Sequence, residues 1–166
     1  KYTLAKLGID VTFVENQDDA EEWRRAVQPN TKLFFAETIG NPKINVLDIR
    51  TVADVAHEAG VPLIVDNTIA TPYLIRPFEH GADIIVHSAT KFLGGHGTVI
   101  GGVIVDGGTF PWTEHADRFP GLTTPDPSYH GAVYTQAVGD ALAYVIKARV
   151  QLLRDLGAAI SPQSAW

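Results

Sequence analysis

Short, continuously apolar runs alternate along the chain with segments of helical periodicity. The runs are VTFV (11–14), LFFA (33–36), PLIV (62–65), DIIVHS (83–88) and VIGGVIV (99–105). Runs that are apolar at nearly every position are typical of strands covered on both faces, as in a parallel sheet. The alternation therefore predicts an α/β protein, with a mostly parallel sheet and helices on both of its faces.

Two segments between these runs carry helix signals. DDAEEWRRAV follows the first run, and its Asp18 and Glu21 have the spacing of a capping box. DIRTVADVAHEAG follows the second run, with Asp48 as the expected N-cap and Gly60 as the expected stop. The apolar positions of this second segment form one helical stripe, made of Ile49, Val52, Ala53 and Ala56.

The last third of the chain has a different pattern. FPGLTTPDPSYHG (119–131) is rich in proline and turn residues, which predicts a loop. AVGDALAYVIKARVQLLRDLG (137–157) has apolar residues at helical spacing, which predicts a long amphipathic helix that ends at Gly157. The sequence has no internal repeat, and nothing in it indicates a second domain.

Composition narrows the class of protein. A chain of 166 residues with 45% hydrophobic and 19% charged residues is expected to form one globular domain with its own core. The formal net charge of −6 argues against a nucleic-acid partner, and no run approaches the roughly 18 apolar residues of a membrane span. The absence of cysteine excludes disulfides, and the six histidines lack ligand spacing, so no metal site is expected. A cytoplasmic location is expected.

Three of the expected strands are followed by polar side chains. These are Glu37 and Asn41 after the second run, Asp66, Asn67 and Thr68 after the third, and Ser88, Thr90 and Lys91 at the end of the fourth. Ligands of open α/β sheets bind beyond the carboxyl ends of the strands. We therefore expect these side chains to converge on one pocket at the same edge of the sheet.

A carboxylate, two hydroxyls and a lysine at one edge fit pyridoxal phosphate. This cofactor needs a lysine for a Schiff base and a carboxylate against its pyridinium nitrogen, and Lys91 and Asp66 are the candidates. Its phosphate needs hydroxyls or helix-terminal N–H groups, and Ser88 and Thr90 carry such hydroxyls. The glycines after Lys91 would let the backbone pass close to the cofactor.

Each of these residues also has a purely structural interpretation. An aspartate such as Asp66 after a strand is commonly a helix cap or a turn former. Ser88 and Thr90 could bond only to nearby backbone, and Lys91 could be a solvated charge. The glycines of GGHGTVIGG could suggest a dinucleotide-binding module, but they do not match the pattern G-x-G-x-x-G. The cofactor hypothesis therefore depends on the combination of residues.

The segment VDNTIATPYLIRPFEHGADIIVHSATKFLGGHGTVIGGVIV (65–105) closely resembles the core of the Cys/Met-metabolism pyridoxal-phosphate enzymes. The earlier segment ETIGNP (37–42) is similar to the same family. The fold that this resemblance implies is the large domain of the pyridoxal-phosphate transferases, which is aspartate aminotransferase-like and belongs to fold type I. The expected α/β class agrees with that implication.

The resemblance also implies a role for individual residues. Lys91 would form the Schiff base with the cofactor, and Asp66 would pair with the pyridinium nitrogen. Ser88 and Thr90 would bind the cofactor phosphate. Asn41 would lie near the ring hydroxyl and the substrate carboxylate, which the strand pattern supports only by placing it at the correct edge of the sheet.

Within the family, TTPDPSYHG and RDLGAAISPQSAW are more similar to the O-acetylhomoserine sulfhydrylases. The implied reaction is γ-replacement in methionine biosynthesis, in which O-acetylhomoserine and sulfide or methanethiol give homocysteine or methionine and acetate. The alternatives are cystathionine γ-synthase, cystathionine γ-lyase or methionine γ-lyase activity. An alternative of another class is an inactive cofactor-domain fragment with only a packing or assembly role. The leaving group and the sulfur donor stay open.

The resemblance covers the middle of a family chain. Residues 1–166 are expected to be the central part of the pyridoxal-phosphate-binding large domain, without its N-terminal segment and without the C-terminal domain. The family implies a homotetramer, built as a dimer of dimers that share active sites. The isolated stretch is expected to bind the cofactor poorly and to turn over little.

Overall fold

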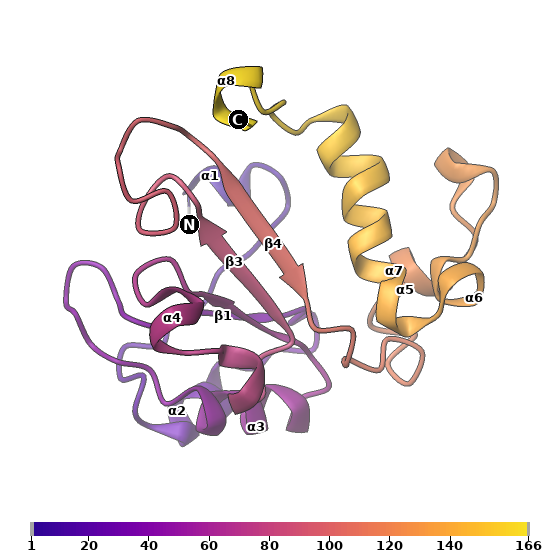
Figure 1. Cartoon of the computed structure of the whole chain (residues 1–166). Helices are drawn as coiled ribbons and strands as arrows, with labels where there is room; N and C mark the ends of the chain where they lie inside the picture. The colour runs from indigo at the N-terminus through magenta and orange to yellow at the C-terminus, as the bar shows by residue number, and fades with distance from the viewer. Residues whose placement is uncertain (1, 166) are drawn as a thin grey trace.

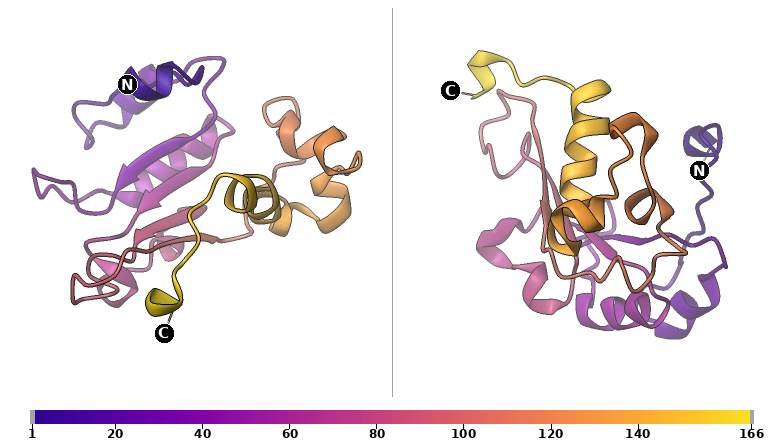
Figure 2. Two further views of the ribbon diagram at one scale, coloured as in Figure 1. Left: turned by 90° about the horizontal axis from the view of Figure 1, so that it is seen from above. Right: turned by 90° about the vertical axis from the view of Figure 1, so that its right-hand side faces the viewer.

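The computed structural model describes residues 2–165. A four-stranded sheet lies at its centre, in the order β1 (Phe34–Glu37), β2 (Leu63–Asp66), β3 (Ile84–Ser88) and β4 (Gly102–Asp106). Helices pack on both faces of this sheet (Figure 1 and Figure 2). The α/β class predicted from the sequence is confirmed.

The sheet is mostly parallel, as predicted. β1, β2 and β3 run parallel to one another, and β4 runs antiparallel to β3. In β4, Val103, Ile104 and Val105 are 42%, 53% and 38% exposed. The expectation of a strand covered on both faces is therefore wrong for β4, which lies at the edge of the sheet.

The first apolar run does not form a strand. Residues 11–14 adopt no regular structure, and Phe13 is 69% exposed. A strand needs a neighbour with which to exchange backbone hydrogen bonds. Among residues 2–165, β1 pairs with β2 alone, and the run 11–14 joins no ladder. The strand predicted for this run is wrong for that reason.

The helices of the N-terminal part are α1 (Tyr2–Ala5) and α2 (Ala20–Ala26). The N-cap of α2 is Asp19 and not Asp18, because Asp19 Oδ1 accepts a hydrogen bond from the backbone N–H of Glu21 at 2.9 Å. This register turns Trp23 into the core, where it is 8% exposed. Burial of the indole decides where the helix begins.

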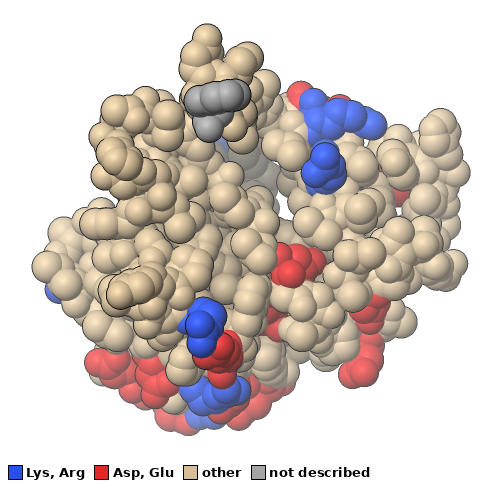
Figure 3. Space-filling view, viewed as in Figure 1, with Lys and Arg blue, Asp and Glu red and all other residues tan. Residues whose placement is uncertain are grey.

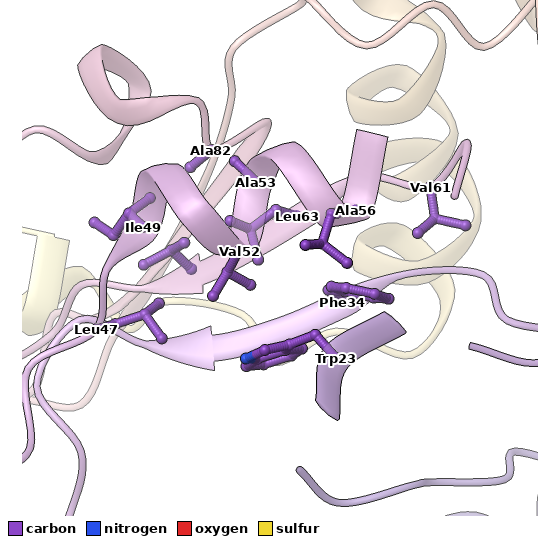
Figure 4. Packing of buried hydrophobic residues seen from close by; sticks show 12 residues of the cluster. Trp23, Phe34, Leu47, Ile49, Val52, Ala53, Ala56, Val61, Leu63 and Ala82 are labelled. Atoms are coloured by element: carbon purple, nitrogen blue, oxygen red, sulfur yellow. The ribbon is translucent and has the colours of Figure 1, made fainter. Parts of the chain in front are cut away.

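Helix α3 (Ile49–Glu58) begins and ends as predicted. The carboxylate of Asp48 accepts hydrogen bonds from the backbone N–H of Thr51 at 3.2 Å and from its hydroxyl at 2.8 Å. Gly60 ends the helix with φ +68°, a conformation that favours glycine. The predicted stripe packs on the sheet in a first core cluster (Figure 4), formed by Trp23, Phe34, Leu47, Ile49, Val52, Ala53, Val55, Ala56, Val61, Leu63, Val65 and Ala82.

Replacing the α3 cap, Asp48→Ala, is expected to lower the free energy of unfolding by about 1 kcal/mol at pH 7. The bonds from Thr51 hold the pKa of Asp48 below its usual value. The cap therefore stabilises fully above the pKa of an unfolded aspartate, about 3.9, and its contribution is lost as the pH falls through the lower folded value. Urea unfolding at pH 7 and at about pH 3 checks this, with Asp54→Ala on the exposed side of α3 as the control. Equal losses in the two variants at pH 7 would contradict the capping role.

The other face of the sheet is covered by α5 (Pro120–Thr123), α6 (Tyr134–Val138) and α7 (Asp140–Lys147). Ile64 and Ile84 are partners in the register of β2 and β3, and both point to this face. The second core cluster consists of Ile64, Ile84, Phe110, Trp112, Leu122, Tyr134 and Ala143. The side chains of β2 thus alternate between the two clusters, as a strand covered on both faces requires.

The predicted long helix is present, but it begins at Asp140 and not at the start of the apolar pattern at residue 137. Gly139 has φ +74° and separates α6 from α7, so that the long helix starts at Asp140. It continues through a π-helical segment, η3 (Ala148–Leu153). Gly157 follows the last turn as predicted, and its N–H donates to the carbonyl of Leu152 at 2.8 Å.

The segment predicted as a loop, 119–131, contains the single turn α5 and a 3₁₀ turn, η2 (Pro127–Tyr129). Asp126 fixes this segment to the long helix, because its Oδ2 accepts a hydrogen bond from Lys147 Nζ at 2.9 Å. The hydroxyl of Ser128 and the ammonium of Lys147 hold the pKa of Asp126 well below its usual range. The carboxylate form of Asp126 is therefore part of the packing on this face.

The remaining short elements are α4 (Thr71–Leu74), η1 (Pro77–His80) and α8 (Pro162–Ala165). α4 and η1 connect β2 to β3, and α4 is labelled in Figure 1. Of the helices in residues 2–165, none combines the length and the apolar character that a bilayer crossing requires.

Candidate cofactor site

The polar residues predicted to converge follow three neighbouring parallel strands. Glu37 is the last residue of β1 and the register partner of Asp66, the last residue of β2. Asp66 is in turn the partner of Val86 in β3, which ends two residues later at Ser88. Parallel strands bring their carboxyl ends to the same edge of a sheet, so these residues share one edge.

Asp66 is held by its own turn. Its Oδ1 accepts a hydrogen bond from the backbone N–H of Thr68 at 2.9 Å, the geometry of an Asx turn. The side chain is neither buried nor fully exposed. Within residues 2–165, its Oδ2 accepts no hydrogen bond from another side chain or from backbone. One carboxylate oxygen therefore orients the group, and the other is available to a ligand.

Lys91 lies in a tight turn directly after β3. Its N–H donates to the carbonyl of Ser88 at 3.0 Å, and its own carbonyl accepts from the N–H of Gly95 at 2.8 Å. Gly94 permits this turn, because a Cβ there would lie 2.7 Å from the carbonyl oxygen of Ala89. The backbone around Lys91 is thus folded onto itself, and its side chain is left exposed.

The charge of Lys91 stands alone in its part of the sequence. From residue 84 to residue 105 it is the single Lys, Arg, Asp or Glu. The face seen in Figure 3 shows no charged side chain at the upper left, whereas acidic and basic side chains gather over α2 and α3 at the lower end. The amine of Lys91 makes no ion pair with any residue that the structure describes. It is a free amine at the edge where the cofactor was predicted.

The two hydroxyls near Lys91 differ in their availability. Thr90 Oγ1 donates to the carbonyl of Gly101 at 3.2 Å and accepts from the N–H of Gly101 at 3.0 Å. The hydroxyl of Ser88 makes no hydrogen bond to a residue in the range 2–165. Ser88 can therefore donate to a phosphate as it stands, and Thr90 can do so after it turns away from Gly101.

Asn41 lies on the turn that follows β1. Its backbone N–H donates to Glu37 Oε2 at 2.8 Å, so the carboxylate of Glu37 shapes this turn. The side chain of Asn41 is exposed. Because β1 is adjacent to β2, the turn of Asn41 lies on the strand next to Asp66, on the side away from β3.

Three polar residues are buried behind this edge, and of these only Asn67 was expected among the polar side chains of the site. Thr38, Asn67 and His87 are 2%, 0% and 6% exposed. The hydroxyl of Thr38 donates to Asn67 Oδ1 at 2.9 Å, and Asn67 Nδ2 donates to the carbonyl of Ile75 at 3.1 Å. His87 is packed in the interior. The only signal in the sequence was the position of these residues at strand ends.

The side chains at this edge fit the needs of pyridoxal phosphate. The edge offers a free amine on Lys91, a free carboxylate oxygen on Asp66 and a free hydroxyl on Ser88, which are the groups that this cofactor needs. No cluster of three His, Asp or Glu side chains suited to a metal ion occurs among residues 2–165. The side chains at this edge are therefore suited to an organic phosphate that carries a reactive carbonyl group.

An α/β sheet with this donor set at its carboxyl edge is typical of the pyridoxal-phosphate-dependent enzymes. Comparison with known proteins identifies the branch. The chain belongs to the Cys/Met metabolism PLP-dependent enzyme family, whose family model matches residues 1–166.

Curated relatives are similar over nearly the whole chain. An O-acetyl-L-homoserine sulfhydrylase of Leptospira meyeri is 55% identical over 99% of this chain and 38% of its own length. An O-acetyl-L-homoserine sulfhydrylase of Corynebacterium glutamicum is 56% identical, with the same coverage of 99% and 38%. The chain thus spans well under half the length of these relatives.

Solved structures agree with the fold. A crystal structure of a protein described as an O-acetylhomoserine (thiol)-lyase of Campylobacter jejuni is 37% identical with a TM-score of 0.91, over 99% of this chain and 40% of that one. That structure contains a pyridoxyl-lysine monophosphate. A cystathionine γ-lyase of Lactobacillus plantarum is 30% identical with a TM-score of 0.68, over 99% of this chain and 34% of that one.

Proposed function

We propose that residues 1–166 are the central part of the cofactor-binding large domain of a γ-replacement enzyme, called the parent enzyme below. It uses O-acetylhomoserine and sulfide, or methanethiol, and forms homocysteine, or methionine, and acetate. The similarity to O-acetyl-L-homoserine sulfhydrylases of two organisms supports this substrate. The observation that carries the proposal is the free amine of Lys91 at the same sheet edge as the carboxylate of Asp66.

In this proposal Lys91 has two tasks. Its amine holds the cofactor covalently when no substrate is present. Once the amino group of the substrate has taken that place, the freed amine removes the proton from the α-carbon and acts as a general base. When bound, pyridoxal phosphate supplies the electron sink that makes this carbon acidic. The same amine would pass this proton to the bound cofactor and take a proton from the β-carbon as acetate leaves from the γ-carbon. Sulfide or methanethiol would then add to the γ-carbon, and the two protons would return to the β- and α-carbons.

The other residues of the edge bind and orient. Asp66 holds a proton on the ring nitrogen through its free Oδ2, while its Oδ1 stays fixed by Thr68. Ser88 and Thr90 donate hydrogen bonds to the phosphate. Asn41 lies near the ring hydroxyl and the carboxylate of the substrate. These assignments agree with the exposed or half-exposed position of each side chain.

We also propose that the parent enzyme is a cytoplasmic homotetramer, built as a dimer of dimers with shared active sites. The family resemblance supports this assembly. The apolar side chains of Phe92, Ile100 and Ile104 are 61%, 84% and 53% exposed, which agrees with a surface that another subunit covers.

The proposal is tested by product analysis of the parent enzyme supplied with pyridoxal phosphate. O-acetylhomoserine and sulfide are expected to give homocysteine and acetate in equal amounts, and O-succinylhomoserine is expected to react more slowly. Parallel incubations contain cystathionine or methionine alone. Formation of a 2-oxo acid and ammonia from either of these, without homocysteine from O-acetylhomoserine, would assign γ-elimination instead and overturn the proposal.

A further inference from the structure

Thr68 bonds to both residues that the proposed function places at opposite ends of the cofactor. Its backbone N–H donates to Asp66 Oδ1 at 2.9 Å, and its hydroxyl Oγ1 accepts from the backbone N–H of Ser88 at 2.7 Å. Asp66 would contact the ring nitrogen, and Ser88 would contact the phosphate. One threonine therefore links the end of β2 to the end of β3.

The hydrogen bond from the Ser88 N–H to the Thr68 hydroxyl replaces a backbone hydrogen bond of the parallel ladder. The N–H of Asn67 donates to the carbonyl of Val86 at 2.9 Å, which is the last backbone bond between β2 and β3. In a regular parallel ladder the carbonyl of Asn67 would accept the next bond, from Ser88. The chain turns after Asp66, and the carbonyl of Asn67 accepts from the backbone N–H of Thr71 at 3.0 Å. Two side chains supply the bonds that the ladder between β2 and β3 then lacks.

The first of these side chains is His87. Its Nδ1 lies 3.1 Å from the carbonyl oxygen of Asn67, and because a carbonyl only accepts, Nδ1 is the donor. The second is Thr68, whose hydroxyl satisfies the N–H of Ser88. Both strand ends are thus fixed by hydrogen bonds to side chains.

We infer that Thr68 is a positioning residue, which sets the spacing between the Asp66 carboxylate and the Ser88 hydroxyl. The inference rests on the proposed function, because it assumes that these two groups hold one cofactor. The backbone N–H of Thr68 orients the carboxylate, and its hydroxyl holds the backbone of Ser88. A cofactor of fixed length binds best when both ends are held in advance.

Two substitutions separate the hydroxyl from the shape of the side chain. Thr68→Val keeps the shape and removes the acceptor, whereas Thr68→Ser keeps the acceptor. Thr113→Val is the control, because Thr113 also loses a side-chain hydrogen bond, to Asp140 at 2.6 Å, far along the chain from the site. The backbone bond from residue 68 to Asp66 persists in each variant of Thr68.

The first readout needs no cofactor. In the parent enzyme freed of pyridoxal phosphate, amide hydrogen exchange at Ser88 is expected to be at least about tenfold faster in Thr68→Val than in the unchanged protein. Thr68→Ser is expected to restore slow exchange, and Thr113→Val to leave it unchanged. Unaltered exchange in Thr68→Val would show that the hydroxyl does not hold Ser88, and would overturn the inference.

The second readout is the Kd for pyridoxal phosphate, from a titration followed by absorbance. Thr68→Val is expected to raise it about tenfold, with rescue by Thr68→Ser and no change in Thr113→Val. Faster exchange at Ser88 with an unchanged Kd would overturn the positioning role. Failure of the unchanged parent enzyme to bind pyridoxal phosphate would overturn the proposed function and the inference together, and the exchange data would still report whether Thr68 holds Ser88.

Discussion

Lys91→Ala in the parent enzyme is expected to lower kcat by about 10,000-fold or more, because it removes the covalent anchor and the general base in one substitution. Asp66, Ser88 and Thr90 remain, so pyridoxal phosphate should still bind without a covalent bond. The turn that carries residue 91 is built from backbone hydrogen bonds, from residue 91 to Ser88 and from Gly95 to residue 91, so an alanine leaves it intact. Single-turnover measurements with O-acetylhomoserine and sulfide give the loss.

Lys6→Ala is the matched control for this experiment. Lys6 is exposed and lies just after α1, so the substitution removes the same charge without touching the carboxyl edge. Turnover of the control is expected to equal that of the unchanged enzyme. If Lys91→Ala kept more than about a hundredth of normal kcat, another group would have to be the base, and the assignment of Lys91 would be wrong.

Asp66→Asn is expected to lower kcat by about 100- to 1,000-fold and to leave the covalent attachment at Lys91 in place. The asparagine Oδ1 can still accept from the N–H of Thr68, so the turn keeps its geometry. The neutral amide cannot hold a proton on the ring nitrogen as a carboxylate does. The loss should therefore appear in kcat for removal of the α-proton, with a much smaller change in cofactor content.

The readout is the primary isotope effect on kcat with α-deuterated O-acetylhomoserine, which should rise as proton removal becomes slower. Asp54→Asn on the exposed side of α3 serves as the charge control and should change neither kcat nor the isotope effect. An Asp66→Asn enzyme with normal kcat, or one that loses the cofactor altogether, would contradict the role of Asp66 as the partner of the ring nitrogen.

Local signals in the sequence were sufficient for part of the fold. Helix α3 was predicted from Asp48 to Gly60 because its cap, its stripe and its stop all indicate the same helix. The strand predicted for 11–14 was wrong, because apolar composition does not supply a neighbouring strand. The antiparallel direction of β4 was not predicted, because the sequence of a run does not state which way the run crosses the sheet.

The site, like the fold, was predictable only in part. Asp66, Ser88 and Lys91 follow apolar runs, and parallel pairing of β2 and β3 brings them to one edge as expected. The task of Thr68 was not predictable, because it depends on which backbone N–H the ladder leaves without a partner. The hydroxyl of Thr90 is already bonded to Gly101, a fact that only the register of the turn after β3 determines.

The central claim is that Lys91 at the carboxyl edge holds pyridoxal phosphate. The most direct test is to reduce the cofactor-loaded parent enzyme with borohydride, digest it and map the modified peptide by mass. Reduction is expected to abolish the visible absorption band and to leave a pyridoxyl group on Lys91, in a peptide that contains the sequence HSATKFLGG. A pyridoxyl group on another lysine, or a loaded enzyme from which no modified peptide forms, would contradict it.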